Sequence, residues 1–140
     1  MALLPDAGAN MIEVLSGSRP DALLMPSKTW RIDFERGRIS GTVDRQEAMP
    51  QAILLMLLVP RYRHVIYSRN YGSELDGVIG KDREIVEVEI ARITREALMA
   101  DDRMRAVENV TIAWGKDEAT VSFDAVTVWG TTRREVSMRV

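Results

Sequence analysis

Tyrosine and arginine are concentrated in one short stretch of this 140-residue chain, residues 61 to 75. The stretch holds the following basic and aromatic side chains: Arg61, Tyr62, Arg63, Tyr67, Arg69 and Tyr71. Such a mixture could stack on bases and bind phosphates, as single-strand nucleic-acid binders do. Tyrosine and arginine are also common anchors of protein interfaces, and a net charge of −2 favours that interpretation over nucleic acid. We interpret the stretch as a recognition surface for protein or a structural clamp.

Paired carboxylates are the second chemistry to test. A glycosidase needs two of them about 5 to 9.5 Å apart, one with a raised pKa. The chain has 21 acidic residues, and several fall in or just after one predicted helix: Glu84, Glu87, Glu89, Glu96, Asp101 and Asp102. An arginine-rich helix makes a solvated face the simpler explanation, and the sequence singles out no pair. We assign no catalytic residue.

Other chemistries have little support in the composition. Cysteine is absent, and His64 is the only histidine, so thiolate chemistry, cysteine-based zinc sites and paired-histidine sites are excluded. No glycine-rich nucleotide loop occurs. We therefore expect no cofactor and no metal site. The longest apolar run, Ala52 to Val59, is too short for the roughly 20 residues of a membrane span, and the N-terminus lacks the pattern of an export signal.

The elements that position these residues follow from their periodicity. Residues 1 to 27 alternate short apolar segments with proline and glycine, which predicts an extended arm that lies on its own domain or awaits a partner. Residues 29 to 43 alternate apolar and polar side chains around Arg36-Gly37, which predicts a half-buried β-hairpin. Trp30, Ile32 and Phe34 are expected on its apolar face.

Two main helices are predicted next. The first, about 45 to 58, begins at an Asp44/Glu47 capping box and contains Pro50. Its second half is apolar on all sides, so either the arm and the C-terminal sheet cover it, or partner helices complete its burial. The second helix, about 83 to 100, follows Asp82 and has an apolar stripe at helical spacing. The members of that stripe are Val86, Ile90, Ile93 and Ala97.

Three strands are predicted in the last third of the chain. Val110, Ile112 and Trp114 alternate with polar or small residues, and a turn at 115 to 118 leads to a second strand with Val121 and Phe123 inward. Beyond Asp124 the apolar phase shifts to Val126 and Val128, which predicts a bulge. A last strand places Val136, Met138 and Val140 on one side. The fold class is therefore α+β: an N-terminal arm and β-hairpin, two main helices and C-terminal antiparallel strands.

Residues 28 to 112 resemble the baseplate-wedge proteins of contractile phage tails, the gene-25-like family, and especially the branch in phage-like elements and tailocins of Gram-positive bacteria. The resemblance rests on these motifs: Gln51-Ala52-Ile53, Leu57, Pro60-Arg61-Tyr62, Ile66-Tyr67-Ser68, Asn70-Tyr71-Gly72, Glu74-Leu75, Glu96-Ala97-Leu98, Asp101-Asp102-Arg103 and Val107. Asp102 stands where many members have proline, and Arg61 to Arg63 replace a Gly-Glu-Arg-like turn.

This resemblance implies a domain at 28–140 similar to the handshake part of a sheath subunit, and a structural rather than enzymatic role. It implies six copies per baseplate, assembly in the host cytoplasm, and a final place in a virion or phage-tail-like particle. Each wedge would hold two copies of a larger wedge protein, joined by this chain through a helical core bundle. The tail sheath protein would add strands to its sheet, and tube or hub proteins are further candidate partners.

Twelve residues are therefore assigned to partner binding, and none to nucleic acid or membrane. They are Ile53, Leu54, Leu57, Leu58, Arg61, Tyr62, Tyr67, Tyr71, Gly72, Glu74, Asp102 and Arg103. Some members of the wider family are described as lysozyme-like, so the alternative is a peptidoglycan-degrading enzyme of the baseplate.

Overall fold

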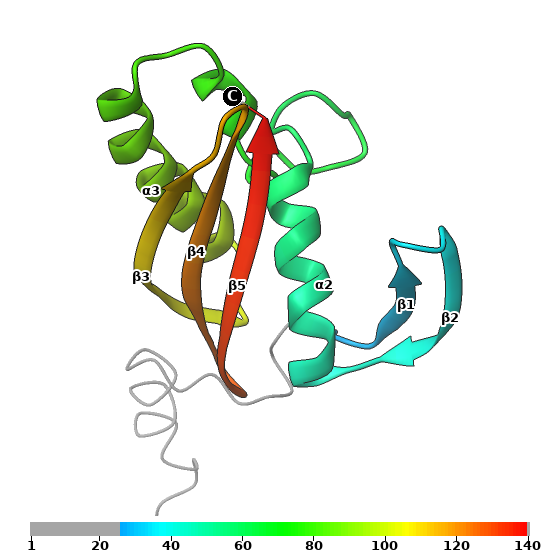
Figure 1. Cartoon of the computed structure of the whole chain (residues 1–140). Helices are drawn as coiled ribbons and strands as arrows, with labels where there is room; N and C mark the ends of the chain where they lie inside the picture. The colour runs from blue at the N-terminus through cyan, green and yellow to red at the C-terminus, as the bar shows by residue number, and fades with distance from the viewer. Residues whose placement is uncertain (1–25, 140) are drawn as a thin grey trace, which may run out of the picture.

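The computed structural model describes residues 26 to 139 and has the α+β class expected from the sequence (Figure 1). The arm predicted for residues 1 to 27 lies outside the described residues except for Pro26 and Ser27, and so does Val140. The elements, in chain order, are β1 (Thr29–Asp33), β2 (Arg38–Val43), α2 (Arg45–Leu58), the 3-10 helix η2 (Leu75–Val78), α3 (Arg83–Met99), β3 (Met104–Trp114), β4 (Glu118–Thr127) and β5 (Gly130–Arg139).

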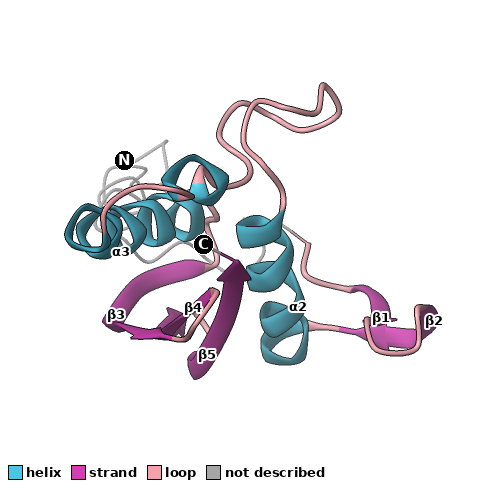
Figure 2. Cartoon of the chain, turned by 45° about the horizontal axis from the view of Figure 1, so that its top comes forward, coloured by secondary structure: helices cyan, strands magenta, loops and turns pink. Residues whose placement is uncertain are grey.

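The body of the protein is an antiparallel sheet of order β3-β4-β5 whose inner face packs against α2 and α3 (Figure 2). Phe123 of β4 is fully buried at the centre of this layer. Met49 and Ile53 of α2 meet it in one cluster with Ile90 of α3. Full burial of a side chain of this kind contributes about 1.5 to 3 kcal/mol. The predicted stripe of α3 is confirmed, because all four of its members are buried.

The irregularities of the sheet lie in β3, and the bulge predicted in β4 is wrong. Both register shifts between β3 and β4 insert an extra residue in β3, and Asn109 at the second shift has a φ of 50°. The alternation of β4 is unbroken, with buried Ala125 and Thr127 continuing the inner face. Because these side chains are small or polar, the sequence did not show that the inward alternation continues through them. The Thr127 hydroxyl is satisfied because it donates to Gln46 Oε1 at 2.9 Å.

Helix α2 has the predicted bounds and runs through Pro50 without a break. The predicted capping box does not form. Instead, Asp44 Oδ1 accepts hydrogen bonds from the Arg45 amide at 2.8 Å and from the Ser27 hydroxyl. These bonds, the one from Ser27 first, lower the pKa of Asp44.

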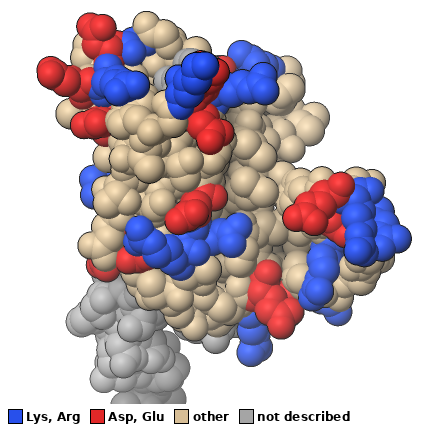
Figure 3. Space-filling model, in the orientation of Figure 1, with Lys and Arg blue, Asp and Glu red and all other residues tan. Residues whose placement is uncertain are grey.

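The β1–β2 hairpin forms as predicted but projects from the body (Figures 1 and 2), so the expectation that its apolar face is half-buried holds for Ile32 and is wrong for Trp30 and Phe34. Trp30 and Ile39 are each 64% exposed. The register shift places an extra residue in β2 at Gly41, whose φ is 68°. Lys and Arg side chains gather along this hairpin (Figure 3).

The Gln51 side chain of α2 ties the hairpin to the body. Its amide nitrogen donates to the Trp30 carbonyl and its amide oxygen accepts from the Ile32 amide, both at 2.9 Å. This side chain therefore occupies the outer edge of β1 as a neighbouring strand would. The Arg31–Glu47 ion pair, at 3.6 Å between exposed side chains, is the weaker tie.

We predict that Gln51→Ala releases the hairpin without unfolding the core. The Ile32 amide should lose protection in hydrogen exchange measured by NMR, while amides of β4 keep theirs, because the two lost bonds serve the hairpin alone. The control Glu47→Ala removes the exposed ion pair and should leave Ile32 protected. Unchanged Ile32 protection in Gln51→Ala would contradict this role.

Candidate functional site

The stretch after α2 is a closed surface loop, residues 61 to 72, whose two ends are held together. The Arg61 amide donates to the Ser73 carbonyl, and the Ser73 amide donates to the Val59 carbonyl, both at 2.9 Å. The buried Ser73 hydroxyl also donates to the Leu57 carbonyl at 2.6 Å. A loop with its ends pinned in this way presents its tip on a fixed base.

Gly72 is required by this closure. Its φ is 98°, and a Cβ atom added there would lie 2.6 Å from the Val59 carbonyl oxygen. Both the backbone conformation and the lack of space exclude a side chain.

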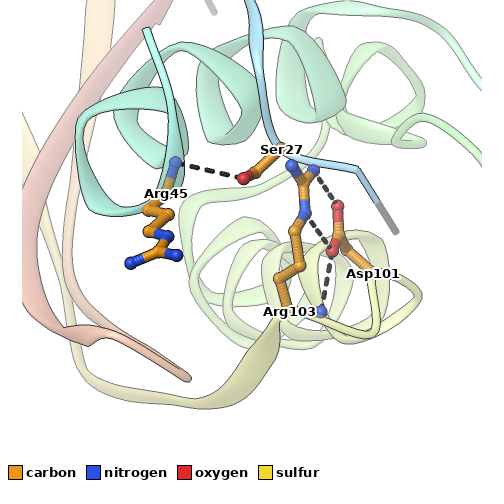
Figure 4. A network of polar contacts seen from close by, with 4 residues as sticks. All are labelled: Ser27, Arg45, Asp101 and Arg103. Carbon is orange, nitrogen blue, oxygen red and sulfur yellow. Dashed lines mark hydrogen bonds and ion pairs between the residues drawn. The ribbon is translucent and has the colours of Figure 1, made fainter. Parts of the chain in front are cut away.

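Tyr71 and Arg103 fix the other side of the loop base. The Tyr67 and Tyr71 rings stack at 4.7 Å between centroids. Burial is the main reason why the pKa of the Tyr71 hydroxyl is raised. Tyr71 and Arg103 line one shallow pocket together with Ser27, where the chain enters β1, and Figure 4 shows the Arg103 side chain beside this segment.

Arg103 itself is held by Asp101 in a mostly buried ion pair (Figure 4). Arg103 Nη2 donates to Asp101 Oδ2 at 2.6 Å, and the Arg103 Nε and backbone amide both donate to Oδ1 at 2.9 Å. Burial alone raises the pKa of Asp101, but these bonds and the arginine charge together outweigh it, so the pKa is lowered. The turn after α3 is thus a rigid block that supports the loop. Asp102, between them, is half-buried.

The tip of the loop is exposed and carries apolar and basic side chains. Val65 is fully exposed and Ile66 is 85% exposed, and Tyr62 lies on the same loop. Residues 61 to 72 contain three arginines and no acid, in a chain of net charge −2. Arg63 pairs with Asp76 at 3.0 Å outside the loop. Exposed apolar side chains on a rigid loop are typical of a protein contact.

The four residues assigned on α2 divide into two pairs. Ile53 and Leu57 belong to the core of their own domain. Leu54 is half-buried and Leu58 is 55% exposed, so these two keep surface for a partner. Glu74 is exposed at the start of η2.

Two grooves border β5, the edge strand of the main sheet. The first, of about 230 Å³, is mostly apolar and lies between the end of α2 and the end of β5; it is lined by Leu57, Leu58, Leu75, Ile79, Val136 and Met138, among others. The second, of about 370 Å³, lies between the hairpin, α2 and Arg134 of β5. Sequence reasoning missed Ile79 and Arg134. The alternation that predicted Val136 and Met138 inward could have identified Arg134, two residues earlier in the same phase.

The outer edges of the strands differ in how open they are among residues 26 to 139. The edge of β1 is occupied by Gln51, and β2 contains a bulge. In β3 two bulges interrupt the strand, and Arg95 Nε donates to the Val107 carbonyl at 3.4 Å. β5 pairs with β4 over ten residues without a shift and carries no such cap on its other side.

Catalytic and metal chemistry gain no candidate from the described part of the chain. The carboxyl groups whose pKa is displaced there, Asp44, Asp101 and Asp124, are all shifted downward, which is the wrong direction for a general acid. No group of three or more potential ligands that could hold a metal occurs within 26 to 139. No helix in that range is long and apolar enough to cross a membrane.

Comparison with known proteins identifies the family. The model of the contractile injection system sheath initiator family matches residues 24 to 130, which include both helices, the closed loop, the Asp101–Arg103 pair and most of the sheet. The chain belongs to this sheath initiator family. It is also 38% identical, over 140 aligned residues, to the phage-like element PBSX protein XkdS of Bacillus subtilis (strain 168), an alignment that covers 96% of this chain and 95% of the relative.

Membership in the sheath initiator family makes the chain a structural component of a contractile tail. The resemblance found in the sequence is thereby confirmed at the level of the contractile tail and the phage-like element. The match includes the closed loop and ends at Gly130, the first residue of β5, so Arg134, Val136 and Met138 lie beyond it.

Loop closure should depend on Gly72. We predict that Gly72→Ala destabilises this sheath initiator by about 1 to 3 kcal/mol, because alanine must adopt a positive φ against the Val59 carbonyl. The free energy of unfolding in urea measures this. Gly77→Ala is the control, since no atom lies within 4 Å of an added Cβ and its φ is not positive; it should be neutral or slightly stabilising. Equal stabilities of the two variants would refute the role of Gly72.

The Asp101–Arg103 pair should make stability depend on acidity. Because the folded-state pKa of Asp101 is below its unfolded value of about 4, its contribution is present above that value and is lost as pH falls through the folded pKa. We predict that Asp101→Asn is less stable than wild type at pH 7 and that the difference shrinks toward pH 2. Urea unfolding at both pH values measures it, and a difference that does not change with pH would contradict the prediction.

Proposed function

We propose that this chain is a wedge subunit of the tail baseplate that starts the sheath by offering the outer edge of β5 for strand addition. The observation on which this rests is the contrast among the edges within residues 26 to 139: β5 is regular and has no hydrogen-bonded cap there over ten residues, whereas β1, β2 and β3 are each capped or interrupted. An open, regular edge pairs readily with an extended segment of another chain.

The grooves beside β5 support the same proposal. In strand addition, backbone bonds set the register and pockets that receive alternate side chains give specificity. An added strand would lie along both grooves, with its inward side chains toward Leu58 and Met138 at one end and toward Leu54 and Arg134 at the other. We infer that the tail sheath protein supplies this strand.

The loop 61–72 and the end of α2 are the proposed contact with the larger wedge proteins. The exposed tip at Val65 and Ile66 provides apolar contact area, and the arginines provide charge-assisted hydrogen bonds. In this proposal the chain joins two copies of the wedge protein through a helical core bundle, six copies form a baseplate, and assembly takes place in the host cytoplasm. The role is non-enzymatic, with tube or hub proteins as additional neighbours.

A co-expression experiment with the sheath protein and the larger wedge protein of the same genetic element tests the β5 contact and the loop contact independently. We predict that Val65→Asp/Ile66→Asp reduces co-purification of the wedge protein at least tenfold and leaves sheath capture unchanged. Both side chains are exposed, so the fold should persist, as circular dichroism would verify.

The control is Val88→Asp, which introduces one aspartate, half the charge added by the double variant, at an exposed apolar position of α3. It should retain both partners. The loop assignment would be overturned if the double variant retained the wedge protein, and strand donation by the sheath would be overturned if wild type captured no sheath protein.

A further inference from the structure

Arg134 is an inward-facing cation on an open edge strand. It pairs across the sheet with Phe123, which is fully buried, so its side chain lies on the inner face. It is half-buried and lines the groove between β5, α2 and the hairpin. Among residues 26 to 139 its side chain makes no hydrogen bond and no ion pair. The other charged groups of this groove, Arg31 and Glu47, pair with each other.

The groove therefore has one unmatched positive charge. A half-buried guanidinium is stabilised when a carboxylate reaches it, because Arg can donate two parallel hydrogen bonds to one carboxylate. A carboxylate that pairs with Arg134 would come from outside the described residues.

The apolar groove, four residues along the same face of β5, fits a different kind of side chain. Met138 is in phase with Arg134, and it lines a mostly apolar groove together with Leu58 and Ile79. At about 3.3 Å per residue, the two positions are about 13 Å apart along the strand. A neighbouring strand has the same spacing, so two of its side chains four residues apart would face the two grooves.

We propose that the occupant of this edge is an extended protein segment with an acidic side chain against Arg134 and an apolar side chain, four residues away on the same face, beside Met138. This rests on the proposed strand addition to β5 and specifies the chemistry of the segment that adds. The ion pair selects the register, since a slip by one residue turns both side chains away from their grooves.

An inward charge on an edge strand can also serve to prevent unwanted pairing. In that case an added strand would be disfavoured because it buries the Arg134 charge without a partner. The two roles differ in one measurable respect: replacing Arg134 with leucine weakens binding of an acidic segment at a docking site, and it does not weaken that binding where the charge is only protective.

Synthetic peptides test the preference on the full-length protein. Two ten-residue peptides have threonine at every second position, and Asp, Val and Leu occupy three consecutive positions between the threonines. The second peptide has these residues in the reverse order, so that both strand directions are tested. Two matched peptides carry Lys in place of Asp. Shifts of β5 amide signals in NMR titration give the site and the Kd. We expect one Asp peptide to bind at least tenfold more tightly than its Lys counterpart, and Arg134→Glu to reverse that order.

Arg133→Glu is the control, because Arg133 lies on the opposite face of β5 and pairs with Asp124 at 3.0 Å. It should leave the preference for Asp unchanged. Equal affinities for Asp and Lys peptides, shifts away from β5, or no binding at millimolar peptide would overturn the proposal. An Arg134→Leu variant that aggregates yet binds the Asp peptide as wild type does would assign Arg134 to edge protection alone.

Co-purification of the sheath protein distinguishes a failure of the acidic contact from a failure of the proposed strand donation. If wild type captures the sheath protein and Arg134→Glu does so equally well, the acidic contact is wrong and strand donation by the sheath stands. If wild type captures no sheath protein but discriminates the peptides as expected, the edge specificity stands and the donor is another protein.

Discussion

Backbone pairing between β4 and β5 runs without a shift from Glu118–Arg139 to Thr127–Gly130, and the position of each β5 side chain depends on it. Because Phe123 and Ala125 of β4 are buried, their partners Arg134 and Thr132 share the inner face. The same phase brings Val136 and Met138 under α2 and η2. A bulge in this ladder would turn the apolar half of β5 outward and remove both grooves.

The irregularities of the fold are placed where they protect other edges. The extra residues of β3 and the Arg95 contact interrupt the opposite side of the main sheet, and Gln51 fills the place of a neighbour beside β1. In the proposed function, these contacts leave β5 as the edge available for strand pairing. On the other side of α2, Gly72 allows the loop to close, and the Asp101–Arg103 pair stabilises the turn near the loop base. The proposal thus assigns one partner to the backbone edge and another to the exposed side chains of the loop.

The sequence predicted the elements that depend on local periodicity, and it missed features that depend on neighbours. Helix α3 and the hairpin were predicted because apolar spacing and the turn at Arg36-Gly37 specify them. The bulge was assigned to the wrong strand, because Ala125 and Thr127 do not look like inward residues and only the pairing reveals that they are. Trp30 was expected to be half-buried, since alternation marks an apolar face but not whether another layer covers it. The assignment of the loop residues to partner binding, made from composition and the resemblance, stays a prediction, whereas Ile53 and Leu57 proved to be core because burial depends on the whole fold.

Hydrogen exchange of the full-length chain, free and in complex with the sheath protein, tests whether the sheath protein adds a strand to β5. The outward amides of β5 should exchange quickly in the free protein and slow by at least tenfold in the complex, because added backbone bonds protect them. Amides of β4, already paired on both sides, should change little. A stable complex in which β5 amides exchange as fast as in the free protein would contradict strand addition at this edge.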